Sequence, residues 1–173
     1  MLSPNIARFG TPLTTLDGRR FKGVLMPAKD SVPTNEFVGV RLLLRVRRDE
    51  PISGGVIIKD HQGRTLLLGE HDYVATAKTF RVFVMTGQYS WLRRGEMTDP
   101  VTGLKKAGAP IEQGPVWAAL EILGSLSADG GTHMPTEKRR VITGAPVALG
   151  DQFDGKLVRR VTRIFSLWLL ETE

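Results

Sequence analysis

Apolar and polar residues alternate along much of this chain, which is the pattern of half-buried β-strands. In residues 40–47 the even positions are apolar, whereas Arg41, Arg45 and Arg47 occupy three of the odd positions. Residues 80–84 alternate in the same way, and glycines and prolines interrupt such runs at short intervals. Many short strands separated by turn residues predict an all-β fold of the small barrel or sandwich type.

The order of these signals in the first half of the chain recurs in the second half. The matched segments are 17–26 and 114–124, 38–47 and 139–143, 51–55 and 146–150, 64–68 and 156–161, and 79–86 and 164–171. A repeated order of elements indicates repeated structural units. We therefore predict two small antiparallel β modules in tandem, 1–88 and 114–173, joined by a linker or arm at 89–113 that is rich in glycine, proline and charge.

Residues 116–126 fit a helix or a strand about equally well, because the run is too short for periodicity to decide. The matched segment 21–26 is typical of a strand, so a strand is favoured. The polar stretch 125–138 is predicted to be a loop of the second module that is disordered or ordered by a partner.

Alternation also selects the side chains that should form the two cores. In the first module these are Leu42, Leu44, Val46, Leu66, Leu68, Val82 and Val84. In the second they are Leu120, Val141, Leu157, Val161 and Leu169.

The composition narrows the class of protein. The 173 residues include 24 Lys and Arg against 18 Asp and Glu, which gives a net charge of +6 and a pI near 10.0. This excess is compatible with a polyanionic partner, and equally with a charge that only keeps the protein in solution. The chain has no cysteine, so it has neither disulfides nor thiolate chemistry. No apolar run has the length of a membrane span and no signal peptide is evident, so we expect a soluble protein that folds in a reducing cytoplasm.

Candidate catalytic and metal-binding patterns are weak. Glu70, His71 and Asp72 are consecutive, but neighbours on a strand point to opposite faces and do not converge on one ion. His61 and His133 have no ligand partner at a recognised spacing, and neither a phosphate-binding loop nor a nucleophile elbow is present. The chain is therefore predicted not to be an enzyme, with no catalytic, cofactor-binding or metal-binding residues.

Basic residues are the main candidates for contact with DNA or with a partner protein. They form four clusters: Arg93 and Arg94; Lys105 and Lys106; Lys138, Arg139 and Arg140; and Arg159, Arg160 and Arg163. Such groups neutralise phosphates, but they are equally typical of a solvated face or of salt bridges between subunits. Trp91, where the first module meets the linker, is the candidate interface anchor, with core packing as the alternative.

The second module resembles a known family. The residues that carry the resemblance are 117–121 (WAALE), 141–143, Gly150 and Asp151 followed by Gly155 and Lys156, and the closing apolar strand 167–171. In this order the segment is similar to the head-tail joining or head-closure proteins of tailed bacteriophages. The resemblance extends to the first module only through the repeat.

The resemblance implies a structural protein of the virion neck or tail, assembled in the bacterial cytoplasm. Such a protein is a small β-barrel that oligomerises into a ring on portal, connector or tail proteins and surrounds a passage for DNA, without reading its sequence. A chain with two barrels departs from the one-barrel members, so closure, collar, adaptor and tail-terminator roles all stay open. The alternative is a nucleic-acid-binding barrel of the OB type, which shares the sheet and the basic charge.

Overall fold

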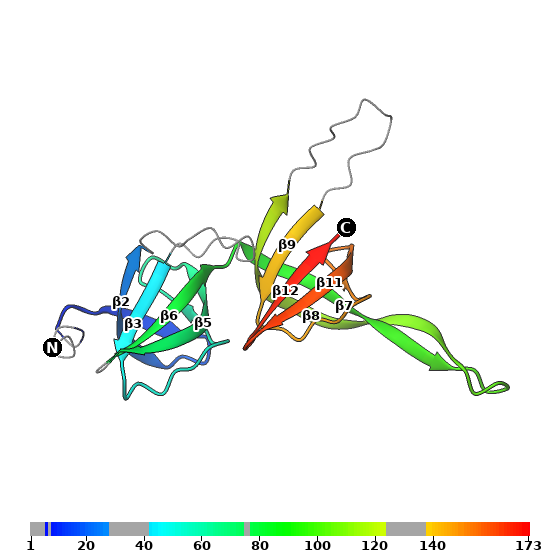
Figure 1. The fold of residues 1–173 in the computed structure, drawn as a ribbon, viewed down its shortest axis with the longest axis horizontal. Helices are drawn as coiled ribbons and strands as arrows, with labels where there is room; N and C mark the ends of the chain where they lie inside the picture. The colour runs from blue at the N-terminus through cyan, green and yellow to red at the C-terminus, as the bar shows by residue number, and fades with distance from the viewer. Residues whose placement is uncertain (1–5, 7, 28–41, 75–76, 124–137) are drawn as a thin grey trace, which may run out of the picture. The chain divides into compact units, whose positions relative to one another are not determined.

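The computed structural model describes residues 6, 8–27, 42–74, 77–123 and 138–173. The chain forms two compact units, one of Met1–Met85 with Ile164–Leu167 and one of Thr86–Arg163 with Trp168–Glu173. Each unit contains a six-strand antiparallel sheet (Figure 1). The all-β prediction is confirmed, and residues 116–123 lie in a strand as predicted. The predicted loop at 125–138 falls outside the described residues except for Lys138, which begins a strand.

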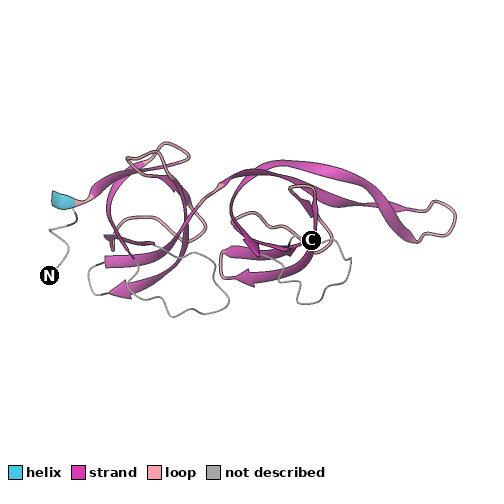
Figure 2. Cartoon of the chain, turned by 90° about the horizontal axis from the view of Figure 1, so that it is seen from above, coloured by secondary structure: helices cyan, strands magenta, loops and turns pink. Residues whose placement is uncertain are grey.

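The first sheet closes into a barrel in the order β1-β2-β3-β6-β5-β4, and Figure 2 shows its strands curling into a ring. Its strands are β1 (Thr11–Thr15), β2 (Arg20–Pro27), β3 (Leu42–Arg47), β4 (Ile57–Lys59), β5 (Thr65–Val74) and β6 (Ala77–Val84). The register shifts between Leu68 and His71, where β5 carries an irregularity opposite β6. Because β1 and β4 also pair, the ring of hydrogen bonds has no free edge.

The core of the first barrel follows the predicted alternation. Leu44, Val46, Leu66, Leu68 and Val82 are completely buried, and Leu42 and Val84 pack against them. Phe80 adds the largest of these side chains. Complete burial of one such side chain stabilises the folded state by about 1.5–3 kcal/mol.

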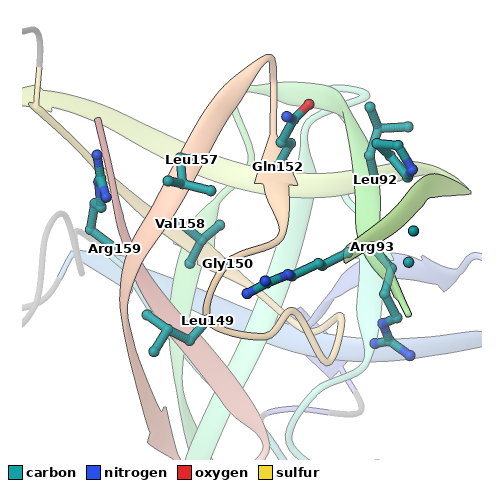
Figure 3. A pocket seen from close by; sticks show the side chains of 12 residues that line it. Leu92, Arg93, Leu149, Gly150, Gln152, Leu157, Val158 and Arg159 are labelled. Atoms are coloured by element: carbon teal, nitrogen blue, oxygen red, sulfur yellow. The ribbon is translucent and has the colours of Figure 1, made fainter. Parts of the chain in front are cut away.

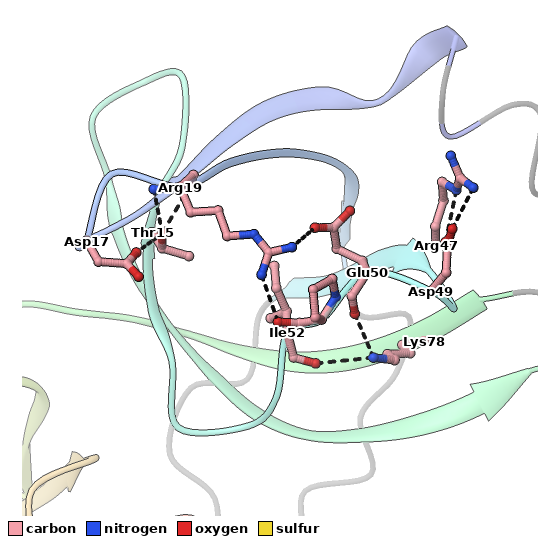
Figure 4. Close-up of polar contacts among 9 residues, drawn as sticks. Thr15, Asp17, Arg19, Arg47, Asp49, Glu50, Ile52 and Lys78 are labelled. Carbon is pink, nitrogen blue, oxygen red and sulfur yellow. Dashed lines mark hydrogen bonds and ion pairs between the residues drawn. The ribbon is translucent and has the colours of Figure 1, made fainter.

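Polar contacts hold the loop between β3 and β4 at one end of this barrel (Figure 4). Arg19 donates to the carbonyl of Pro51 at 3.1 Å and forms an ion pair with Glu50 at 2.6 Å. From β6, the Lys78 ammonium donates to the carbonyl of Glu50 at 2.7 Å. These contacts keep the loop in place, so that Ile52 is buried in the core.

The second sheet follows the order β10-β11-β12-β9-β8-β7, and the short β10 pairs with β7 to complete a second barrel. Its strands are β7 (Gly87–Thr98), β8 (Lys105–Leu123), β9 (Lys138–Thr143), β10 (Gln152–Phe153), β11 (Lys156–Ile164) and β12 (Leu167–Thr172). The predicted linker or arm at 89–113 therefore lies within β7, β8 and the turn between them. It belongs to the second unit, which begins at Thr86 rather than at 114.

The predicted core of the second module needs two corrections. Val141 is buried and Leu120 and Val161 pack against the core, but Leu157 and Leu169 are not part of it. Leu157 lies opposite the exposed Gln152, and cross-strand partners share one face of a sheet.

The apolar run in β12 does not reveal which of its leucines face inward. Leu170 lies opposite the core residue Val141 and is completely buried, whereas Leu169 lies opposite Ile142 on the other face. The prediction was therefore one residue out of phase, and such an error moves a side chain to the opposite face.

Both barrels share one strand order. Counted along the chain within each unit, the order around the ring is first, second, third, sixth, fifth and fourth. The segments that the sequence matched correspond to β2 and β8, β3 and β9, β5 and β11, and β6 and β12, and each pair holds the same place in its ring.

Candidate interaction site

A buried carboxylate organises one side of the second barrel. Asp151 is only 1 % exposed, and its side chain accepts hydrogen bonds from the Trp91 indole at 2.9 Å, the Ala148 amide at 2.9 Å and the Arg94 amide at 3.1 Å. The first and third donors belong to β7 and the second to the loop before β10. One carboxylate therefore holds this loop against β7.

A groove of about 500 Å³ lies beside this anchor (Figure 3). Leu149 and Gly150, in the loop before β10, form one wall of the groove. Arg93 and Arg94 of β7, with the adjacent part of β8, form the other. Further lining comes from apolar and polar side chains of β7, β10 and β11, namely Leu92, Gln152, Leu157, Val158 and Arg159. The groove thus combines apolar surface with three guanidinium groups and offers no carboxylate nucleophile or acid-base pair.

The distal part of β7 and β8 forms a two-stranded arm, defined here as residues 93–113, which runs beyond the other strands of its unit (Figure 1). The last pair between β7 and β10 is at Leu92, and the pairing of β8 with β9 begins at Ala118. Among the described residues, no strand pairs with either outward edge of the arm. Two paired strands alone are only marginally stable in water.

Ion pairs and exposed apolar side chains characterise the arm. Glu96 pairs with Lys105 at 2.7 Å, and Asp99 pairs with Lys106 at 2.5 Å. The lysines lower the pKa of both carboxyl groups, and Glu96 in turn raises the pKa of Lys105. Large apolar side chains that lack cover are Met97, Val101, Leu104 and Ile111, with 55 % to 89 % exposure.

Acid should loosen the arm before it unfolds the barrels. The folded-state pKa values of Glu96 and Asp99 lie below the ordinary values of 4.5 and 3.8 for these side chains. The stabilising contribution of the two ion pairs is therefore complete above the ordinary values and is lost as the pH falls through the lowered pKa values. We expect amide exchange in the arm, corrected for its intrinsic pH dependence, to be faster at pH 3 than at pH 7. Unchanged protection of the arm at pH 3 would show that these ion pairs do not hold it.

Most of the predicted basic residues are engaged within the chain. Arg139 pairs with Asp154 at 2.7 Å, Arg159 with Glu173 at 3.7 Å, and Arg160 with Glu171 at 3.9 Å. The Arg163 guanidinium lies 5.5 Å from the centre of the Trp168 ring. With the pairs of Lys105 and Lys106, these are ion pairs within one chain, which differ from the salt bridges between subunits that the sequence left open.

The cluster of Lys138, Arg139 and Arg140 also has acidic neighbours. In β9, Arg140 is opposite Glu121 of β8 on one side and opposite Glu171 of β12 on the other. Lys138 is exposed at the beginning of the same strand, opposite Leu123. Arg93 and Arg94 line the groove with Arg159, and they also line a neighbouring hollow along the arm with Lys105 and Lys106. The acidic Glu96 and Asp151 line the same hollow, so its surface carries both charges.

Trp91, the candidate interface anchor, lies in the core of the second barrel and is 6 % exposed. Its indole donates to Asp151, and the Arg93 guanidinium lies 4.9 Å from the centre of its ring. Trp91 therefore packs in a barrel core, which is the alternative that the sequence analysis gave to an interface anchor.

The acidic and histidine cluster lies in β5. His71 is opposite Phe80 and Asp72 is opposite Thr79, and the His71 ring contacts the rings of Tyr73 and Phe80 at centroid distances of 4.6 and 4.9 Å. In the described part of the chain, no three His, Cys, Asp or Glu side chains are placed to hold a metal ion.

Sequence reasoning missed the role of Asp151. The sequence signal was visible, since Gly150 and Asp151 belong to the motif that carried the family resemblance. Its donors, however, include Trp91 and Arg94, which are about 60 residues away in the chain.

No family model, curated protein or solved structure matches this chain. None of the described helical residues forms a helix that is long and apolar enough to cross a membrane.

Proposed function

We propose that this chain is a non-enzymatic structural protein of the neck or tail of a tailed bacteriophage, which oligomerises into a ring around the DNA passage and contacts portal, connector or tail proteins. The observation that supports assembly is the structure of the arm. Its two outward edges pair with no described strand, and Met97, Val101 and Leu104 are exposed on it. The bacteriophage setting rests on the resemblance of the second module to head-tail joining proteins.

The arm suits head-to-tail assembly because its two edges differ. One edge belongs to β7 and the other to β8, so the β7 edge of one copy would pair with the β8 edge of the next. Such a contact joins different surfaces of identical chains, and rings form when the rotation between copies closes. Exposed apolar side chains of the arm would then be covered by the neighbouring copies.

We further propose that the two barrels arose by tandem duplication. Their common strand order and the matched sequence signals support this origin. After divergence, the second copy carries the arm, since its first two strands span 12 and 19 residues against 5 and 8 in the first copy.

Removal of the distal arm should abolish assembly and leave the barrels folded. We expect a chain in which residues 96–109 are replaced by a short Gly-Ser turn to be monomeric, because both cores lie outside the deletion. Light scattering after size exclusion reports the mass of the intact and shortened chains, and circular dichroism reports folding. A folded, shortened chain with the same oligomeric mass as the intact chain would refute assembly through the arm.

A further inference from the structure

The groove beside Asp151 lies at the foot of an unpaired strand edge. Its floor is on the outer face of the second barrel, since Leu92 and Leu157 lie opposite the exposed Gln152 from either side (Figure 3). The strand between them, β10, has only two residues. Past β10, towards the arm, no strand of the described residues pairs with the outward edge of β7. This edge therefore begins where the groove lies.

Two of the three guanidinium groups in the groove are engaged within the chain. Arg93 donates to the carbonyl of Pro146 at 2.9 Å. Arg159 forms an ion pair with Glu173 at 3.7 Å. The third cation, Arg94, is exposed and lines the same groove.

The contacts of Arg94 leave its guanidinium group able to bind a further anion. Its backbone amide donates to Asp151, and its side chain passes over Gly150, where an added Cβ would lie 3.7 Å from the Arg94 Cδ. In the described part of the chain, the guanidinium takes part in no hydrogen bond or ion pair. Glu96, two residues further along, is held by Lys105 at 2.7 Å. Lys105 is the main cause of the lowered pKa of Glu96, and the charge of Arg94 adds a smaller effect from a distance.

Apolar surface surrounds this arginine. Leu149 is 66 % exposed on one wall of the groove, and Leu157 is half-buried on its floor. Interfaces combine such apolar contacts with a few well-placed polar ones. The groove therefore fits a polypeptide segment that carries apolar residues next to a carboxylate.

Residues 110–112 of β8, in the sequence Pro-Ile-Glu, have this chemistry. Ile111 is 55 % exposed, and the exposed Glu112 carboxylate has no hydrogen bond or ion pair with any residue that the structure describes. Glu112 lies opposite Leu92, so it is on the outer face of the sheet, as the groove is. The pairing of β8 with β9 begins only at Ala118, so this segment lies on an outward edge.

The direction of β8 leads this segment to the groove of an adjacent copy. In the ring proposed above, the β8 edge of one copy joins the β7 edge of the next. Neighbouring copies in a ring have nearly the same orientation, so these two strands run antiparallel, as β7 and β8 do within each arm. From the tip of the arm, β8 then runs towards the groove of the adjacent copy and brings residues 110–112 to it.

We infer that residues 110–112 of one copy occupy the groove of the next, where the Glu112 carboxylate binds the Arg94 guanidinium. Guanidinium and carboxylate groups match in shape and charge, and the apolar residues of the segment cover Leu149. The inference rests on the proposed ring, and it names the side chains that join its subunits.

The test reverses each charge and follows the mass of the full chain by light scattering over a series of concentrations. Arg94→Glu and Glu112→Arg each place like charges at every junction, so half-assembly should require about tenfold more protein or a higher excess. Both side chains are exposed, and the contact with Asp151 uses only the backbone of Arg94. Tryptophan fluorescence should therefore show that the second barrel stays folded in both variants.

A mixture of the two variants distinguishes a contact between copies from a contact within one chain. When the two variants alternate, every junction joins two original or two reversed charges, which are opposite in sign. The mixture should therefore regain the mass of the unmodified chain, as should the double variant Arg94→Glu/Glu112→Arg. Assembly of the double variant without assembly of the mixture would place the contact within one chain and overturn the inference.

Arg20→Glu is the matched control, because it reverses the charge of an exposed arginine in the first unit, outside the arm and the groove. Its mass should equal that of the unmodified chain at each concentration. If Arg94→Glu assembled as readily as Arg20→Glu, or if both lost assembly equally, this contact would be refuted while the ring itself stood. An unmodified chain that is monomeric at every concentration would refute the ring, and the contact with it.

Discussion

Replacement of Asp151 by alanine should destabilise the second barrel by about 3–5 kcal/mol. The substitution leaves the Trp91 indole and the amides of Arg94 and Ala148 without their acceptor in a site that is almost fully buried. It also releases the loop before β10 from β7, so the groove should lose its wall. A loss of this size is a large part of the stability of a small domain.

The distribution of tryptophans makes this effect measurable in one unit. Trp91, Trp117 and Trp168 all belong to the second unit, so urea unfolding followed by tryptophan fluorescence reports that barrel. The control is Glu173→Ala in the same unit, whose carboxylate is 37 % exposed in an ion pair with Arg159 at 3.7 Å and should contribute at most about 1 kcal/mol. An Asp151→Ala midpoint within error of the unmodified chain would contradict the role of Asp151 as an anchor.

The second large effect is expected at Gly95, where the arm leaves the barrel. Gly95 lies at a register shift between β7 and β8, and a Cβ built on it would lie 1.9 Å from the carbonyl oxygen of Ala109. No real side chain tolerates that separation from backbone, so Gly95→Val should force the strands apart. We expect faster amide exchange throughout the arm and loss of assembly, with the fluorescence of the barrel retained.

Ala107→Val is the matched control for this substitution. Ala107 lies opposite Glu96 in the same ribbon and is exposed, and a β-branched side chain is compatible with a strand. Its amide protection should therefore resemble that of the unmodified chain. If Gly95→Val kept the same protection as Ala107→Val, the close approach at Gly95 would not constrain the arm.

The sequence predicted the strands well where alternation was strong. The run around Leu44 and Val46 has one apolar and one basic face, so both its strand and its core face were readable. The ambiguous run that contains Leu120 was assigned to a strand through its counterpart in the first half. Leu157 and Leu169 were assigned to the wrong face, because continuous apolar runs do not reveal which residue lies opposite which.

The candidate site was less predictable, because it depends on pairs that are distant in the chain. A basic cluster looks the same in sequence whether or not acids face it, and Arg140 acquires its two glutamates only when β8, β9 and β12 align. Arg45 likewise lies opposite the uncharged Val24 and Thr79, and the sequence alone does not reveal these pairs. Sequence patterns therefore found the cations, but cross-strand register decides which residues lie opposite them.

Ring formation is the central claim, and electron microscopy of the negatively stained, full-length protein tests it most directly. The account predicts closed rings with a central opening, whose subunits are joined through their arms, at concentrations where light scattering shows an oligomer. Monomers at every concentration, or filaments that never close, would contradict it.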